Sequence, residues 1–274
     1  MRSKKFVVVY ALAIFLIVML VTINAVCSIS QFEIYCATGS TFGAARAEAV
    51  QSRLDEEYRG KSFLFFNENS VYDTVSEEGG GYLEVLEVQK VFPNKITVSV
   101  SERFETFAFE KDGRYYAVGD DGTVLAIRDS AISNIGINNT VVTGFTFPDQ
   151  KVGDVFTVDA SCQGAYAALQ ALMDELKERD VQYNAEKIMY GTMGASDPQF
   201  NYSYFYVTAV ENVGIWIEGP ETRTDEKIQA ALDYYESLDD GQRTYGYISV
   251  VEETGSGQIK PSYSHNVPPI SDGE

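Results

Sequence analysis

The sequence predicts an α+β fold: a single N-terminal transmembrane helix, a small β-α-α-β-β module, and a C-terminal mixed β-sheet domain with flanking helices. Three observations predict it. An uncharged apolar run covers residues 6–26, two helical patterns precede a hairpin pattern at 82–101, and short alternating segments recur between residues 103 and 252. The content of 18 Tyr and 16 Phe also favours β-rich packing.

The apolar run at residues 6–26 is long enough to cross a bilayer, because a helix rises ~1.5 Å per residue and the hydrocarbon core is about 30 Å thick. Residues 1–5 carry three basic residues and no acid, so we expect a short cytoplasmic N-terminus with the rest of the chain outside. A cleaved signal peptide ending near Ala25-Val26-Cys27 is the alternative. An uncleaved anchor is favoured because the run exceeds the ~7–15 apolar residues of a signal peptide.

Residues 28–102 show the element order strand, helix, helix, strand, strand. The predicted strand covers residues 31–37, the helices 43–59 and 67–76, and the hairpin 82–90 and 95–101. Apolar residues of the first helix recur at spacings of three and four, which places them on one face. In the last strand, after the Pro93-Asn94 turn, Ile96, Val98 and Val100 alternate with Thr and Ser, which is typical of a strand with one buried and one solvated face.

Residues 103–252 make up the predicted C-terminal β domain. Asp-Gly pairs at 112–113 and 121–122 suit tight hairpin turns. Helices are predicted at about 161–179 and from residue 224, where two acids favour the helix start. The predicted strands include residues 138–145, 186–190, 202–210, 214–218 and 244–251. From 253 to 274 the composition turns to Gly, Ser, Pro and Asp, which predicts a disordered tail.

Composition argues against several functions. The net charge of −19 disfavours nucleic acid as a partner, because the phosphate backbone would be repelled. The chain has no C-x-x-C pair and a single histidine, His265 in the predicted tail, so neither a metal site nor a Ser–His–acid catalytic set is expected. The three cysteines allow one disulfide at most, for which Cys36 and Cys162 are the candidates.

One segment carries a family likeness. It has the pattern V-x-x-x-F-P-x-x-I-x-V-x-V-x-E-R, followed by a turn and a D-G hairpin. The matching residues, to which we assign a structural role, are Val88, Phe92, Pro93, Ile96, Val98, Val100, Glu102 and Arg103. This pattern, downstream of one predicted membrane segment, resembles the FtsQ/DivIB family of bacterial cell-division proteins. Weaker likenesses in the C-terminal part, such as Val142-Thr143-Gly144 and Tyr247-Ile248-Ser249-Val250, extend the resemblance to nearly the whole chain.

The resemblance implies a non-enzymatic, single-pass scaffold of the division complex, without cofactor or metal. The module at 28–102 would be a POTRA domain. The implied partners are two small single-pass proteins, one FtsL-like and one FtsB/DivIC-like, through which the protein is linked indirectly to the septal wall synthase. The implied location is the cell membrane at the division septum, with the two domains outside.

A partner-binding site is expected at the last strand, because an open sheet edge exposes unpaired backbone groups that can template an added strand. The residues of this predicted last-strand edge are Thr244, Tyr245, Tyr247, Ser249 and Val251. The alternative is that Tyr245 and Tyr247 only cover the core. A second candidate surface lies on the strand at 95–100, with Lys95, Thr97 and Ser99, although a core role of that strand is favoured. A different class of function, an exported adhesin or carbohydrate-binding cell-wall module with tyrosines as stacking platforms, remains the alternative.

Overall fold

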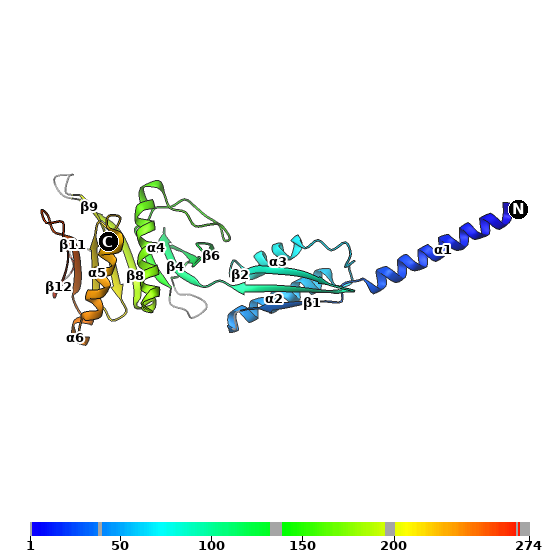
Figure 1. The fold of residues 1–274 in the computed structure, drawn as a ribbon, viewed down its shortest axis with the longest axis horizontal. Coiled ribbons are helices and arrows are strands. Elements are labelled where there is room, and N and C mark those ends of the chain that lie inside the picture. The colour runs from blue at the N-terminus through cyan, green and yellow to red at the C-terminus, as the bar shows by residue number, and fades with distance from the viewer. Residues whose placement is uncertain (1, 38–39, 132–138, 195–200, 267, 269–274) are drawn as a thin grey trace. The chain divides into compact units, whose positions relative to one another are not determined.

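The computed structural model describes residues 2–37, 40–131, 139–194, 201–266 and 268, and the side chains of most of these (Figure 1). The chain divides into two compact units, Met1–Phe104 and Glu105–Glu274. The first begins with helix α1, Arg2–Val26, whose described side chains are exposed. Within the described residues, no helix combines the length and the apolarity needed to cross a membrane.

The rest of the first unit confirms the predicted strand-helix-helix-strand-strand order. Its elements are β1 (Gln31–Cys36), α2 (Thr41–Tyr58), α3 (Asn69–Gly79), β2 (Leu83–Val91) and β3 (Lys95–Glu102). The three strands form a sheet in the order β1-β3-β2, in which β3 runs parallel to β1 and antiparallel to β2. The two helices cover one face of this sheet (Figure 1).

The core of the first unit lies between that face and the helices. Ile96, Val98 and Val100 are fully buried, as their alternation predicts, and pack with Val50 and Leu54 of α2. The intervening Lys95, Thr97 and Ser99 are on the opposite face by strand alternation. The second candidate surface, with Lys95, Thr97 and Ser99, is not a sheet edge, because β3 is the central strand and is paired on both sides.

Other residues of the family-like segment support the unit from the turn and the end of β3. Glu102 is buried and accepts a hydrogen bond from the Ser40 hydroxyl, which also caps α2 by accepting from the Gly43 amide at 2.9 Å. Arg103 donates its amide to the Tyr82 carbonyl at 2.9 Å. Phe92, by contrast, is exposed.

The second unit is built on one mixed nine-stranded sheet in the order β12-β11-β10-β9-β8-β7-β4-β5-β6. Its strands are β4 (Glu105–Lys111), β5 (Arg114–Gly119), β6 (Val124–Arg128), β7 (Thr140–Thr143), β8 (Ala185–Met193), β9 (Tyr202–Ala209), β10 (Gly214–Glu218), β11 (Tyr247–Glu252) and β12 (Ile259–Ser264). The pairs β4–β7, β7–β8 and β10–β11 are parallel, and the other pairs are antiparallel.

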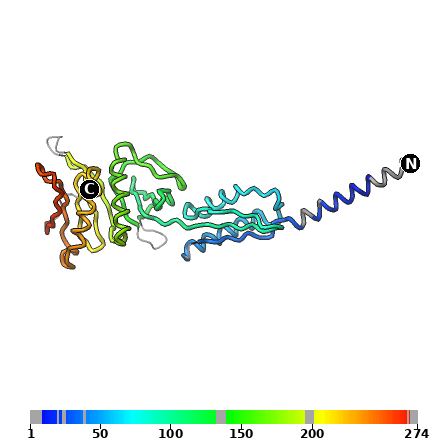
Figure 2. The backbone as a smooth tube through the Cα atoms, viewed as in Figure 1, coloured from blue at the N-terminus to red at the C-terminus, as the bar shows by residue number. Residues whose placement is uncertain are grey.

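Helices α4 (Gln163–Glu178) and α5 (Thr224–Ser237) lie against one face of this sheet, as the ribbon and the backbone trace both show (Figures 1 and 2). Short helical turns precede α4 at Ala160–Cys162 and β8 at Gln182–Asn184, and α6 (Asp240–Arg243) follows α5. The apolar faces of α4 and α5 pack on alternate residues of the strands, among them Phe109, Phe205 and Ile217.

The prediction of a disordered tail over 253–274 is wrong for Ile259–Ser264, which form β12. Residue 267 and residues 269–274 of that predicted tail lie outside the described residues, as does residue 138, where the predicted strand 138–145 begins. β12 follows a turn around Gly255 and Gly257, both with positive φ, and pairs antiparallel with β11. Among the described residues, the last strand of the sheet is therefore β12.

Candidate partner-binding edge

Strand β12 forms one edge of the nine-stranded sheet. It pairs with β11 over six residues, from Tyr247 opposite Ser264 to Glu252 opposite Ile259, and no further strand of the sheet follows it on its outer side in the described residues. Figure 1 shows β11 and β12 together at the end of the sheet, beside α5. An edge strand of this kind can accept an added strand.

The direction of the backbone groups of β12 follows from the hairpin. The Glu253 amide donates to the Gln258 carbonyl at 2.8 Å, so this pair is hydrogen-bonded. Because hydrogen-bonded and non-hydrogen-bonded pairs alternate in an antiparallel ladder, the backbone groups of Ile259, Pro261 and Tyr263 face outward. Proline has no N–H, so the edge offers three carbonyl acceptors and only two donors.

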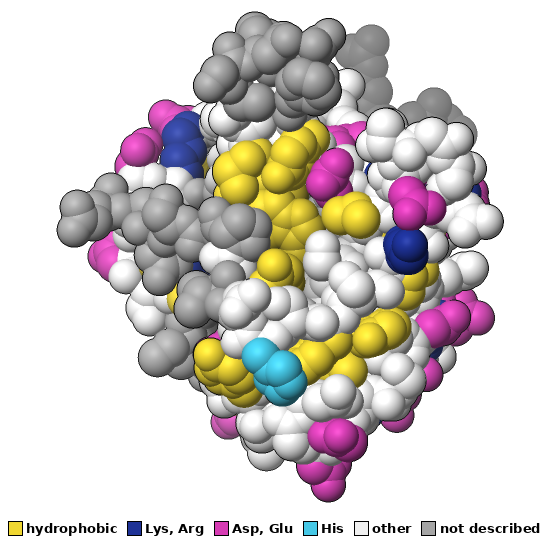
Figure 3. Space-filling model, turned by 90° about the vertical axis from the view of Figure 1, so that its left-hand side faces the viewer, with side chains coloured by type: hydrophobic (Ala, Val, Ile, Leu, Met, Phe, Trp, Pro, Cys, Tyr) yellow, Lys and Arg dark blue, Asp and Glu magenta, His cyan; other side chains and the backbone are white. Residues whose placement is uncertain are grey.

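The side chains of β12 alternate between the two faces of the sheet. Ile259 and Tyr263 are partly buried and pack against the core beneath α5. Lys260, Ser262 and Ser264 therefore lie on the face without α5. Figure 3, which views this end of the molecule, shows bands of apolar side chains with acidic side chains mainly toward the rim.

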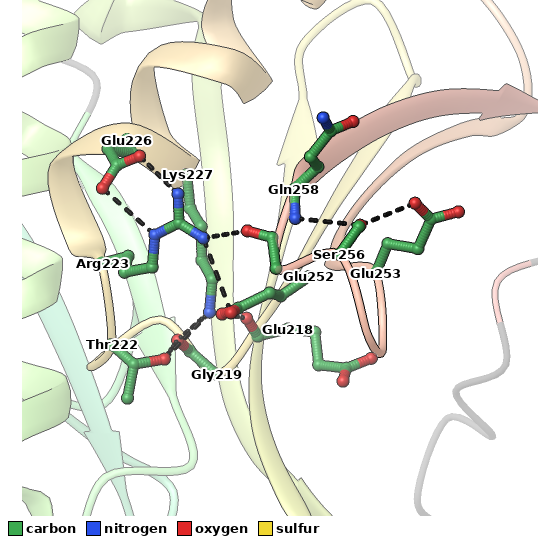
Figure 4. A network of polar contacts seen from close by, with 11 residues as sticks. Glu218, Gly219, Thr222, Arg223, Glu226, Lys227, Glu252, Glu253, Ser256 and Gln258 are labelled. Atoms are coloured by element: carbon green, nitrogen blue, oxygen red, sulfur yellow. Dashed lines mark hydrogen bonds and ion pairs between the residues drawn. The ribbon is translucent and has the colours of Figure 1, made fainter.

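A group of polar contacts, which we call the hairpin clamp, fastens the β11–β12 turn to α5 (Figure 4). Arg223, just before α5, has a left-handed backbone (φ 50°) and pairs with Glu226 through two bonds of 3.1 and 2.6 Å. The same guanidinium lies 3.5 Å from a Glu252 carboxylate oxygen and donates to the Gly257 carbonyl. One cation thus holds both the end of β11 and the turn before β12.

Lys227 adds a buried connection within the hairpin clamp. Its side chain extends from α5 toward the end of β10, and the residue is only 3% exposed. Its ammonium group donates to the carbonyls of Glu218 and Gly219, at 2.8 and 2.7 Å, and to the Thr222 hydroxyl at 3.0 Å. Burial lowers the pKa of Lys227, and burial likewise raises the pKa of Glu218.

The far end of β12 is held by aromatic contacts. The Tyr263 hydroxyl donates to the Tyr245 carbonyl at 2.6 Å, and the Tyr263 ring meets the His265 ring edge-on at 4.9 Å between centroids. Gly246, the residue after Tyr245, has φ 79°, and a Cβ there would come within 2.3 Å of the Ser264 carbonyl oxygen. Glycine is required at this position because it allows both the left-handed backbone and the close approach of β12.

The structure separates the residues of the predicted last-strand edge. Tyr247, Ser249 and Val251 lie on β11, whose backbone is paired with β10 on one side and β12 on the other. Thr244 caps α6 and Tyr245 is exposed, and both precede β11. The prediction that 244–251 is an open edge is therefore wrong, because β12 occupies it.

Sequence reasoning missed the β12 residues, although a signal was present. Ile259, Pro261 and Tyr263 alternate with polar residues after the turn Gly255-Ser256-Gly257, which is a hairpin pattern. Pro261 argued against a strand, yet proline is tolerated on an edge strand where its nitrogen faces away from the sheet.

The cysteines and possible metal ligands give no second site. Cys162 is a buried thiol whose sulfur lies 3.4 Å from the Thr146 hydroxyl, and Cys36, its candidate disulfide partner, belongs to the other unit. Among the described residues, no group of three or more His, Cys, Asp or Glu side chains is placed to hold a metal ion.

No protein-family model matches this chain, and no curated protein matches it closely enough to be named as a relative. Any assignment of function therefore depends on the residues and on the geometry of the sheet edge.

Proposed function

We propose that this chain is a membrane-anchored scaffold of the bacterial division complex, similar to FtsQ/DivIB proteins, that binds FtsL-like and FtsB/DivIC-like single-pass partners. The observation that carries the proposal is the order of parts. A β-α-α-β-β unit is followed by a sheet domain that ends in a rigidly held edge strand, β12. In this scheme the protein acts by binding and by linking its partners to the septal wall synthase, with no catalytic step and no cofactor.

The proposed contact is strand addition to β12. The partner strand would form hydrogen bonds with the outward backbone N–H and C=O groups of Ile259 and Tyr263. At Pro261 it could bond only to the carbonyl, because proline has no N–H. The hairpin clamp supports this role, because a template strand that is already fixed loses little conformational freedom on binding. Tyr247, Ser249 and Val251 would then act only through side chains on the sheet face beside the added strand.

The proposed anchor is the apolar segment 6–26 within α1, with residues 1–5 in the cytoplasm. Its support is the absence of charge from this segment and the exposure of the described side chains between Val9 and Val26. Exposure of these apolar side chains to water is unfavourable, whereas the hydrocarbon core of a bilayer would accommodate them, and the backbone groups bond within the helix.

The stacking-platform alternative finds less support in the second unit. Among the described tyrosines, Tyr204 stacks most closely on another ring, that of Trp216, with centroids 4.2 Å apart, and both residues are buried, with Trp216 3% exposed. Sugar binding by stacking needs an accessible ring face, which this pair does not offer.

Site-specific photo-crosslinking in dividing cells tests the proposal. A photoreactive residue at Ser262, exposed on β12, should form an adduct with a small single-pass protein, whereas the same probe at the exposed Tyr183 should not. A fluorescent fusion of the full chain should gather at midcell. An even distribution around the cell would refute the division role, and midcell gathering without a Ser262 adduct would refute the β12 contact.

A further inference from the structure

One end of the first unit directly follows α1. Here the chain leaves α1 after Val26 and enters the unit through several backbone hydrogen bonds, one of them from the Gly60 amide to the Ile29 carbonyl at 2.8 Å. The Phe63 amide donates to the Cys27 carbonyl at 2.8 Å, the Ile29 amide to the Lys61 carbonyl at 2.9 Å, and the Ser30 amide to the Asn94 carbonyl at 2.8 Å. The loop 61–66 and the turn 92–94 therefore lie beside the point where α1 ends, and we call this region the anchor-proximal end.

The anchor-proximal end exposes large apolar side chains. Phe65 is 88% exposed, Phe92 73% and Leu64 52%, and the two phenylalanines are the most exposed large apolar residues described between 27 and 104. Their neighbours Phe63 and Phe66 are buried, so the loop backbone is fixed while Leu64 and Phe65 project outward. Scattered exposed apolar residues are ordinary, but three at one end indicate a binding surface.

The charge of this end also departs from that of the chain. Its segments 26–31, 58–68 and 88–96 contain four basic residues and one acid: Arg59, Lys61, Lys90, Lys95 and Glu68. Asp55 and Glu33 pair with Arg59 and Lys95, and with them included the basic residues still outnumber the acidic ones. The whole chain has a net charge of −19, so anionic lipid repels this end less than it repels the acidic remainder of the two units.

We propose that the anchor-proximal end rests in the interfacial layer of the same phospholipid bilayer that holds α1. Phe65, Phe92 and Leu64 enter the boundary between headgroups and acyl chains, and Lys61 faces the headgroup phosphates. Aromatic and basic residues are the types that favour this layer. The inference rests on the proposed anchor, because continuity with α1 brings the exposed residues within a few residues of the membrane.

Tryptophan scanning in vesicles tests this contact. The full chain is reconstituted into vesicles of phosphatidylcholine and phosphatidylglycerol that contain a brominated phosphatidylcholine quencher. The variants are Phe65→Trp and, as a matched control, Leu86→Trp. Leu86 is exposed on β2. It lies five residues, or about 16 Å along the strand, from Val91, which adjoins the turn 92–94 at the anchor-proximal end. Trp216, buried in the second unit, gives the same background in both.

The brominated lipid should quench a larger fraction of the emission in the Phe65→Trp variant than in the wild type. The fraction quenched in the Leu86→Trp variant should not exceed that in the wild type. Phe92→Trp should behave like Phe65→Trp, which covers the case that one substitution disturbs the loop. Flotation of the vesicles in alkaline carbonate reports on the anchor separately. A chain that does not float refutes the anchor and the contact together. A floating chain with equal quenching at positions 65 and 86 refutes the contact alone.

Discussion

Replacing Lys227 by methionine should loosen the hairpin clamp and lower the stability of the second unit. Methionine has a similar length and fills the same space, so the change removes the ammonium group without leaving a large cavity. The carbonyls of Glu218 and Gly219 would lose the donor that they share, at 2.8 and 2.7 Å. Lys227 is almost completely buried and Glu218 and Gly219 are partly buried, so water can replace the lost donor only in part.

The expected loss is about 2–4 kcal/mol of unfolding free energy. Each buried acceptor left without its donor costs about 1–3 kcal/mol, and relief from burying a charge offsets part of the sum. The difference in unfolding free energy between the wild type and the methionine variant should be smaller at pH 7 than at pH 9.5. Because burial lowers the pKa of Lys227, the unfolded chain holds more protons above the folded pKa. The wild-type protein therefore gains stability as pH rises toward about 10.5, and the methionine variant lacks this gain.

Urea unfolding of the second unit at pH 7 and pH 9.5 measures both effects, with Lys187→Met, an exposed lysine on β8, as the matched control. Hydrogen exchange at Ile259 and Tyr263 should show whether β12 loosens with the clamp. A Lys227→Met protein that stays within about 0.5 kcal/mol of the control would refute the reasoning, because changes at exposed sites have that size.

Two further outcomes follow from other buried polar pairs. Arg128→Met should lower the unfolding free energy by about 3–5 kcal/mol, because Arg128 donates to the fully buried Glu105 carboxylate at 3.0 and 2.8 Å. The control Arg114→Met, at an exposed site, should lower it by less than about 0.5 kcal/mol. Equal melting temperatures of the two variants would contradict this prediction. Burial, together with a bond to Glu211, raises the pKa of Tyr235 to about 12, so stability present below pH 10 should be lost between pH 10 and 12. Tyr235→Phe should reduce that loss in urea titrations at pH 9 and 11.5, and an unchanged pH slope would count against it.

The elements of the first unit were predictable because each has a local cause. Ile96, Val98 and Val100 alternate in sequence and are buried in the structure, since burial of a strand face needs that period. Pairing was not predictable from the same pattern. Nothing in strand 95–102 indicates that it lies between β1 and β2, because lateral order depends on contacts between segments far apart in sequence.

The candidate site shows the same limit at the C-terminus. The alternation of Ile248 and Val250 identified β11, whose two neighbours are set by the fold. β12 was hidden because Pro261 and two turn glycines have the composition of a disordered segment. Its place at the edge, where a proline nitrogen needs no partner, becomes visible only once the register with β11 is known.

Pro261 also affects how copies of this protein meet one another. If two β12 strands paired antiparallel about a twofold axis at residue 261, proline would face proline and the central pair would have two acceptors and no donor. An ordinary partner strand with an N–H at that position loses a single bond. Pairing of two copies in this register is therefore disfavoured more than pairing of β12 with a strand that has no proline at that position.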